Sequence, residues 1–242
     1  MVFTEDDAVE SVPWRPPPRP QRSRARVPVP APVALPAARC DNEREGPSRS
    51  IGLATDGALE DGCRIASTGP GYVAVNKHAW GTDLMVAVLQ AAAATVAQQF
   101  PAGAPTVIGA LSAEGGGTLR PHRSHQSGRD VDVGYFRTGQ KSARRFEPTD
   151  SGNFDPEKTW ALLEAILYSA DVTFVFLDYE LQAVLYDGLV EVGWSEAALG
   201  MLFQYPAGRD VPRGVIRHAR GHADHFHVRF RCPAADKPDC VD

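Results

Sequence analysis

The sequence predicts an α+β fold with a small antiparallel sheet and flanking helices. Two short segments, 130–134 and 225–231, alternate polar and apolar residues with a period of two, which is typical of half-buried strands. Longer segments such as 84–100 carry apolar residues at every fourth position, which is typical of helices. The predicted strands and helices do not alternate as regular βαβ units, so we expect an antiparallel sheet with segregated helices.

The composition fits one soluble globular domain preceded by a tail. Hydrophobic residues make up 43% of the chain, and the net charge of −5 comes without an extended basic face, which argues against nucleic acid as a partner. No apolar run is long enough to span a bilayer, because the best one, 84–97, is interrupted by Gln90. Residues 1–12 hold four acidic side chains and no apolar stretch, so no secretory signal is visible there.

Two regions follow from the distribution of proline. Half of the 20 prolines lie in the first 50 residues, with arginines between them. Residues 1–49 are therefore predicted to form a disordered, extended linker, and residues 50–242 a single domain. We expect the linker to be a spacer; a tether to an anchor, or a weak basic contact with an anionic polymer, is the alternative.

The first half of the domain contains one long predicted helix and two loops. Asp83 is expected to cap a helix that ends at Phe100, directly before a proline. Residues 106–111 are predicted to form a buried strand, and the glycine-rich segment 114–117 a solvent-exposed loop. Residues 137–155 are polar and could either rim a substrate groove with their basic side chains or form a solvated loop; these side chains are Lys141, Arg144 and Arg145.

The second half is predicted to contain three more helical segments. Residues 157–170 and 180–192 are expected to be helices separated by a β-branched and aromatic strand at 172–177. Ser195 is expected to cap a further helical stretch that ends at Phe203. A polar segment, 209–221, then leads to the last strand.

That last strand carries an unusual number of histidines. Four of the seven histidines lie between positions 218 and 227. His225 and His227 share one face of the strand, about 7 Å apart at a rise of ~3.3 Å per residue. This separation suits one histidine that binds a metal ion and a neighbour that reaches a water molecule on that ion. The alternatives are a buried core histidine or a solvated run of polar residues.

A second cluster lies around residue 125 and could complete such a site. Asp130 and Asp132 share one face of a short predicted strand, and a turn at 127–128 could fold His125 back over it. Two histidines and one carboxylate with an open fourth position form the ligand set of a catalytic zinc site. The alternative is a solvated, aspartate-rich strand end.

The two clusters together resemble a known family. The pattern Ser-His-Gln-Ser-Gly-Arg-Asp-Val-Asp at 124–132, followed by His-Ala-Asp-His-Phe-His-Val-Arg-Phe-Arg-Cys-Pro at 222–233, is similar to the penicillin-insensitive murein endopeptidases. These are LAS metallopeptidases, a group that includes lysostaphin-type enzymes, D-Ala-D-Ala carboxypeptidases and the hedgehog signalling domain. The resemblance covers about residues 50–242 and implies the LAS/hedgehog-type fold.

The resemblance also implies roles for individual residues. His225 matches the catalytic histidine, and His222 a further active-site histidine. His122 matches a residue able to hold a second metal ion, whose other ligands would fall near Asp150 and Asn153. The family has histidine at the latter position, and this departure argues against a second ion. The residues that match the zinc ligands are His125, Asp132 and His227.

The implied activity is zinc-dependent hydrolysis of D-alanyl–meso-diaminopimelyl cross-links in peptidoglycan, in the periplasm or cell envelope. His225 would be the general base. The residues alone imply only metal-assisted hydrolysis. Two alternatives are a D,D-carboxypeptidase on the same scaffold and a non-catalytic, zinc-stabilised module that binds peptidoglycan.

The four cysteines are predicted to form disulfides. Cys232 and Cys240 are close enough to close a short loop, worth about 2.5 kcal/mol in the chain-entropy model. A cysteine pair directly after this strand is also a feature of the family. Cys40 and Cys63 could form the second bridge. Zinc–thiolate binding is the competing interpretation, but the Cys-x2-Cys spacing is absent. Paired cysteines favour an oxidising compartment.

Overall fold

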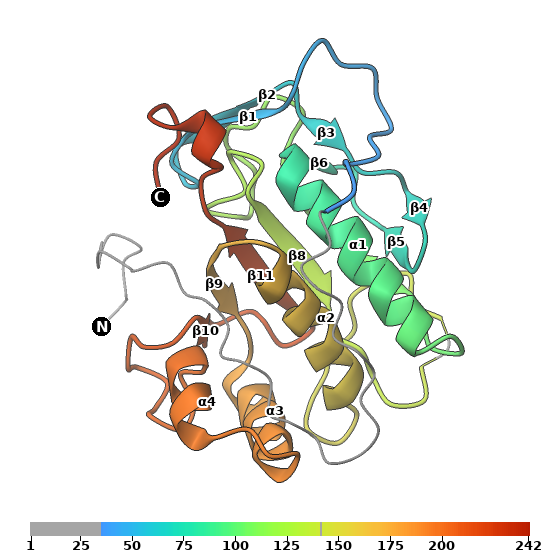
Figure 1. Cartoon of the computed structure of the whole chain (residues 1–242), viewed down its shortest axis with the longest axis vertical. Coiled ribbons are helices and arrows are strands. Elements are labelled where there is room, and N and C mark those ends of the chain that lie inside the picture. The colour runs from blue at the N-terminus through green and yellow to red at the C-terminus, as the bar shows by residue number, and fades with distance from the viewer. Residues whose placement is uncertain (1–34, 141) are drawn as a thin grey trace.

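The computed structural model describes residues 35–140 and 142–242 (Figure 1). Most of the predicted linker, residues 1–34, and Lys141 lie outside the described residues. Residues 35–49 contact the domain: Cys40 is disulfide-bonded to Cys63, Arg44 forms an ion pair with Asp83, and Leu35 packs against the core. This part of the predicted linker is therefore attached to the domain.

The centre of the fold is a seven-stranded sheet with the order β10-β9-β11-β8-β7-β5-β4. Its middle strands pair antiparallel, as predicted, but β10 with β9 and β5 with β7 are parallel. The sheet is thus larger than expected and mixed. Its strands are β4 (Thr68–Gly69), β5 (Tyr72–Ala74), β7 (Thr106–Ile108), β8 (Asp130–Gly134), β9 (Val172–Phe176), β10 (Ile216–Arg217) and β11 (His225–Phe230).

Two small sheets lie beside the central one and were not predicted. Their strands have only two to four residues, which is too short for a period of two to stand out in the sequence. The first pairs β1 (Arg49–Gly52) with β2 (Gly57–Glu60), and the second pairs β3 (Cys63–Arg64) with β6 (Trp80–Gly81).

Four α-helices surround the sheet within the described residues, close to the predicted positions. They are α1 (Asp83–Gln99), α2 (Pro156–Ser169), α3 (Tyr179–Glu191) and α4 (Glu196–Leu202), followed by a short 3₁₀ helix, η1 (Ala234–Asp236). The predicted cap of α1 was wrong by one residue. Thr82 Oγ1 accepts a hydrogen bond from the Met85 amide, whereas the Asp83 carboxylate pairs with Arg44.

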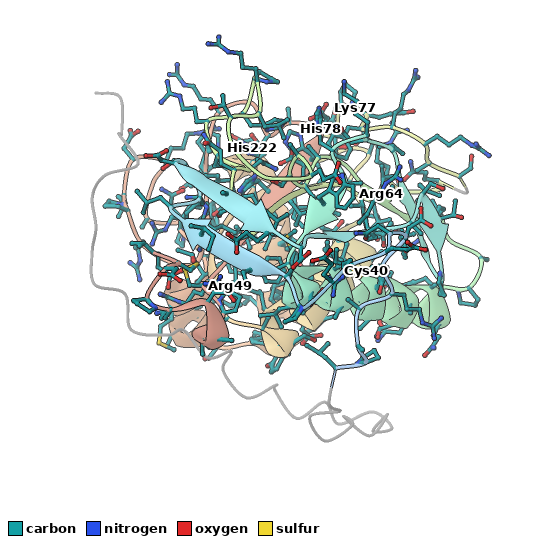
Figure 2. All side chains as sticks on the ribbon, turned by 90° about the horizontal axis from the view of Figure 1, so that it is seen from above. Cys40, Arg49, Arg64, Lys77, His78 and His222 are labelled. Carbon is teal, nitrogen blue, oxygen red and sulfur yellow. A yellow bond between two sulfur atoms is a disulfide. The ribbon has the colours of Figure 1, made fainter. Side chains whose placement is uncertain are left out.

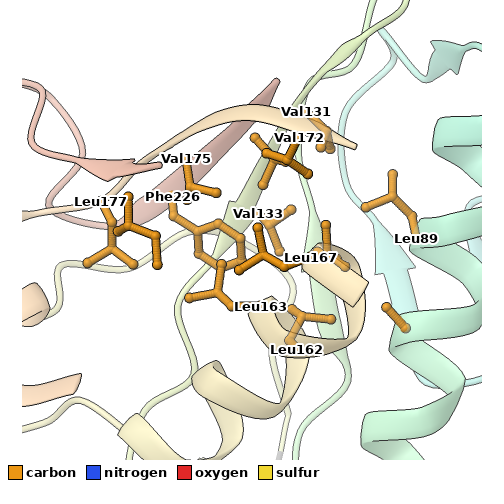
Figure 3. Packing of buried hydrophobic residues seen from close by; sticks show 14 of the residues in the cluster. Leu89, Val131, Val133, Leu162, Leu163, Leu167, Val172, Val175, Leu177 and Phe226 are labelled. Carbon is orange, nitrogen blue, oxygen red and sulfur yellow. The ribbon is translucent and has the colours of Figure 1, made fainter. Parts of the chain in front are cut away.

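The hydrophobic core lies between the helices and one face of the sheet. Figure 3 shows α2 leucines packed against valines of β8 and β9 and against Phe226 of β11. Because side chains alternate along a strand, Asp132 and His227 lie on the opposite face. Figure 2 shows His222 on the side of the molecule away from α1. The helices therefore cover one face of the sheet, and the histidines lie on the other face.

Both cysteine pairs are disulfide-bonded, Cys40 with Cys63 and Cys232 with Cys240. The predicted pairings are thus present, and the second one joins the end of β11 to the last residues of the chain. None of the helices in the described part of the chain is both long and apolar enough to cross a membrane.

Candidate metal centre

Strand register and one turn bring the two histidine clusters together. In the antiparallel pair β8–β11, His227 lies directly opposite Asp132. His125 reaches the same place from a turn in which its own φ is 66° and that of Gly128 is 71°. A side chain at Gly128 would also lie 2.7 Å from Leu59, so glycine is required there. The structure therefore has His125 folded back over β8, as the sequence predicts.

Three donor atoms converge at this point. His125 Nε2 lies 3.1 Å from His227 Nδ1 and 3.3 Å from Asp132 Oδ1, and His227 Nδ1 lies 3.1 Å from that same oxygen. All three side chains are buried. Three donors at nearly equal separations form one triangular face of a small coordination site, and His122 and His225 lie next to it.

Hydrogen bonds on the far side of each ring determine which nitrogen faces the cluster. His125 Nδ1 lies 2.6 Å from the carbonyl oxygen of Leu111, so this nitrogen carries the proton and Nε2 is free. His227 is arranged the other way round: its Nε2 lies 2.8 Å from Asp130 Oδ1, which leaves Nδ1 free. Both free nitrogens face Asp132, which is the arrangement a metal ion needs.

His122 lies at the outer edge of the cluster. Its Nδ1 is 3.6 Å from Asp132 Oδ2, and the donor atoms of His122, His125 and Asp132 all lie within 4.8 Å of one another. Asp150 and Asn153, the expected further ligands of a second ion, instead cap their own turn: the Asp150 carboxylate accepts the Asn153 amide, and the Asn153 side chain accepts the Asp150 amide.

The predicted catalytic histidines lie beside the donor triangle. His225 Nε2 is 3.8 Å from Asp132 Oδ1, and its other nitrogen, Nδ1, is 2.6 Å from Asp224 Oδ1. Asp224 therefore holds the ring with Nε2 toward the cluster. The ring of His222 follows, with its centroid 5.0 Å from that of His225 and 6.2 Å from that of His227. All six predicted site residues thus occupy one region of the sheet face.

Aromatic side chains enclose the histidines, and the sequence analysis did not find them. The ring of Phe146 is stacked on that of His225, with centroids 4.9 Å apart and an angle of 11° between the planes. Phe146 fits because the backbone beneath it carries two glycines, Gly109 and Gly134. On the other side, the ring of Phe176 lies 5.6 Å from that of His222. These rings form the walls of the site.

Burial and charge shift the pKa values of this cluster in different directions. Burial alone would raise the pKa of Asp130 and of Asp132. The charge of Arg229 and the hydrogen bond of His227 outweigh burial at Asp130, and the hydrogen bonds of His125 and His227 outweigh it at Asp132, so both pKa values lie well below the usual range. Burial acts to lower the pKa of His227, yet its two aspartate partners raise it to about 9, so without a cation Nδ1 also carries a proton at pH 7, and a bound ion would replace that proton. Burial, assisted by its histidine neighbours, lowers the pKa of His222 to about 4, so this ring is neutral at pH 7.

Comparison with known proteins identifies one family and one relative that this chain resembles. A family model described as penicillin-insensitive murein endopeptidase matches residues 50–164, which include His122, His125 and Asp132. The predicted family resemblance is confirmed. A protein of Haemophilus influenzae named penicillin-insensitive murein endopeptidase is 29% identical over 206 residues, covering 78% of this chain. The match spans 66% of that murein endopeptidase, slightly less than two thirds of its length.

Proposed function

We propose that this chain is a zinc-dependent murein endopeptidase that hydrolyses D-alanyl–meso-diaminopimelyl cross-links in peptidoglycan. The observation that carries the proposal is the donor triangle of His125, Asp132 and His227, with edges of 3.1–3.3 Å. Tetrahedral zinc with bonds of about 2.0–2.1 Å separates its ligand atoms by roughly 3.3–3.4 Å. Two imidazoles and one carboxylate favour zinc, whereas Ca²⁺ and Mg²⁺ prefer oxygen ligands.

A zinc ion bound there would supply Lewis acidity, lowering the pKa of a water molecule and polarising the scissile carbonyl. His225 is placed to accept the proton of the attacking water at Nε2, because Asp224 occupies its other nitrogen. The same nitrogen can later deliver that proton to the leaving amine. His222, neutral at pH 7, directs its Nδ1 proton to the carbonyl oxygens of Ala219 and Arg220, so its Nε2 is an acceptor that can orient the attacking water or the substrate.

The choice of substrate rests on the comparisons and on the motifs. The name of the Haemophilus influenzae relative supports murein as the substrate, and the family resemblance of the two histidine motifs supports the cross-link as the scissile bond. Two disulfides support a location in an oxidising compartment such as the periplasm or cell envelope.

Digestion of purified diaminopimelate-type murein, with the products separated by chromatography, tests the proposal. The zinc-loaded protein should convert cross-linked dimers to monomers, and a chelator should stop it. His225→Ala should retain zinc but lose roughly 10²–10⁴-fold in turnover. His78→Ala, which changes a histidine outside the cluster, is the matched control and should remain fully active.

Three other outcomes contradict the proposal in different ways. Release of free D-alanine without cleavage of dimers would indicate a D,D-carboxypeptidase. Binding of murein without any product would indicate a zinc-stabilised binding module. Full turnover by His225→Ala would exclude this histidine as the general base.

A further inference from the structure

One buried carboxylate beside the donor triangle has no part in the chemistry proposed above. Asp130 is fully buried, and both of its oxygens are engaged. Oδ2 accepts the backbone amide of His125 at 3.1 Å, while Oδ1 accepts His227 Nε2 and Arg229 Nε, both at 2.8 Å. A single side chain thus contacts two of the three residues that form the triangle.

We infer that Asp130 is a positioning residue for the metal centre: it selects the ring nitrogen that His227 presents and holds the backbone of His125 in place. This inference rests on the proposed metal site. It assigns to Asp130 no contact with substrate or with a reacting atom, only contacts with the two histidine ligands.

The first part of the inference concerns the ring of His227. A neutral imidazole has one N–H and one free nitrogen, and the group that accepts the N–H decides which is which. Asp130 accepts at Nε2, so Nδ1 is left free at 3.1 Å from both His125 Nε2 and Asp132 Oδ1. Carboxylates that hold a ligand histidine in this way typically contribute 10–100-fold to metal affinity.

The second part concerns the backbone of His125. Its φ of 66° lies in the left-handed region, which residues with a side chain avoid unless a contact compensates. The hydrogen bond from the His125 amide to Asp130 Oδ2 is such a contact, because it satisfies a buried donor within the turn. The Leu111 carbonyl then orients the ring.

Arg229 compensates the cost of burying the Asp130 carboxylate by forming an ion pair with it. It is the direct cross-strand neighbour of Asp130, and its Nε donates to the oxygen that also accepts His227. A buried charge needs such a partner.

Zinc affinity, measured by competition with a chromophoric chelator, tests the inference. Asp130→Asn keeps the size of the side chain but retains only one acceptor oxygen, so it cannot serve both the His125 amide and His227. We expect its zinc Kd to rise 10–100-fold. Asp236→Asn is the first control, because Asp236 is a buried aspartate that accepts the Ser50 amide away from the donor triangle. Asp224→Asn is the second control, because Asp224 contacts His225, which is not one of the three proposed zinc ligands. Both should bind zinc like the unaltered protein.

A folded Asp130→Asn protein with unchanged zinc affinity would overturn the inference and leave the proposed function intact. Failure of the unaltered protein to bind zinc at all would overturn both. If Asp130→Asn does not fold, ¹⁵N-histidine NMR of the unaltered, zinc-loaded protein decides. One zinc-bound histidine should be coordinated through Nδ1 with a slowly exchanging Nε2–H, and two Nε2-coordinated histidines would refute the role of Asp130.

Discussion

Gly109→Ala should disturb the site chiefly through Phe146, because its added Cβ meets Asp132 only at the backbone carbonyl, 3.2 Å away. A Cβ at position 109 would lie 2.3 Å from Cζ and 2.9 Å from Cε2 of the Phe146 ring. Carbon atoms in favourable contact are about 3.5–4.0 Å apart, so the ring must withdraw by roughly 1 Å or more. Gly109 itself cannot move away easily, because its amide donates to the Asp132 carbonyl at 2.8 Å.

Phe146 contacts both Gly109 and the ring of His225, so the substitution should affect stability and turnover. Overpacking of this kind costs about 1–3 kcal/mol in the free energy of unfolding. Displacement of the ring also removes its stack on His225, and a misplacement of about 1 Å near the chemistry can cost up to ~10²-fold in turnover. Zinc affinity should not change, because Phe146 stacks on His225 and not on His125 or His227.

Urea unfolding, zinc titration and murein digestion together measure this prediction. Gly188→Ala in α3 is the matched control, since nothing lies within 4 Å of its added Cβ, and it should stabilise the protein by about 0.5–1 kcal/mol. In a Phe146→Ala background, Gly109→Ala should cost much less, with only the 3.2 Å contact to the Asp132 carbonyl remaining. An equal cost in both backgrounds would refute the reasoning.

Three further predictions concern stability. Replacing Cys232 and Cys240 by serine should lower the free energy of unfolding by about 2.5 kcal/mol in denaturant titrations, since the bridge closes a loop with a sequence separation of 8; a loss below the experimental error would contradict this. Arg129→Met should cost about 3–5 kcal/mol, because the buried guanidinium ties β8 to the carboxylate of Asp242; a melting temperature within two or so degrees of the original would rule this out. Ser195→Ala should cost about 1 kcal/mol, because Ser195 Oγ caps α4; calorimetry should show this loss.

The helices were predictable from the sequence because their determinants are local. Apolar residues at every fourth position mark α1, and Ser195 marks the start of α4 through its hydrogen bond to the Ala198 amide. The cap of α1 was misassigned because both Thr82 and Asp83 can cap a helix. Arg44, which is distant in sequence, pairs with the Asp83 carboxylate, and Thr82 is the residue that caps the helix.

The residues of the donor triangle were predictable for a different reason. Histidine and aspartate on one face of a strand are unusual in a core, so their chemistry shows in the sequence. Phe146 and Asp130 gave no such indication. Phe146 lies in a polar segment that could be a solvated loop. Asp130 lies two residues before Asp132, where a solvated, aspartate-rich strand end is an ordinary explanation. Their roles depend on which backbone and which rings they contact in three dimensions.

The register of β8 against β11 is the step that turns two sequence motifs into one site. A slip by one residue would move the whole histidine face to the core side, whereas a slip by two would preserve the faces and still separate the ligands. In the observed register His227 lies opposite Asp132, and Arg229 lies opposite Asp130 with a 2.8 Å ion pair. A slip by two in one direction would place His227 opposite Gly134 and Arg229 opposite Asp132, and Arg231 would then face Asp130. Such a slip keeps an arginine opposite Asp130 yet takes His227 away from Asp132, so the donor triangle depends on the register itself and not on charge pairing at Asp130 alone.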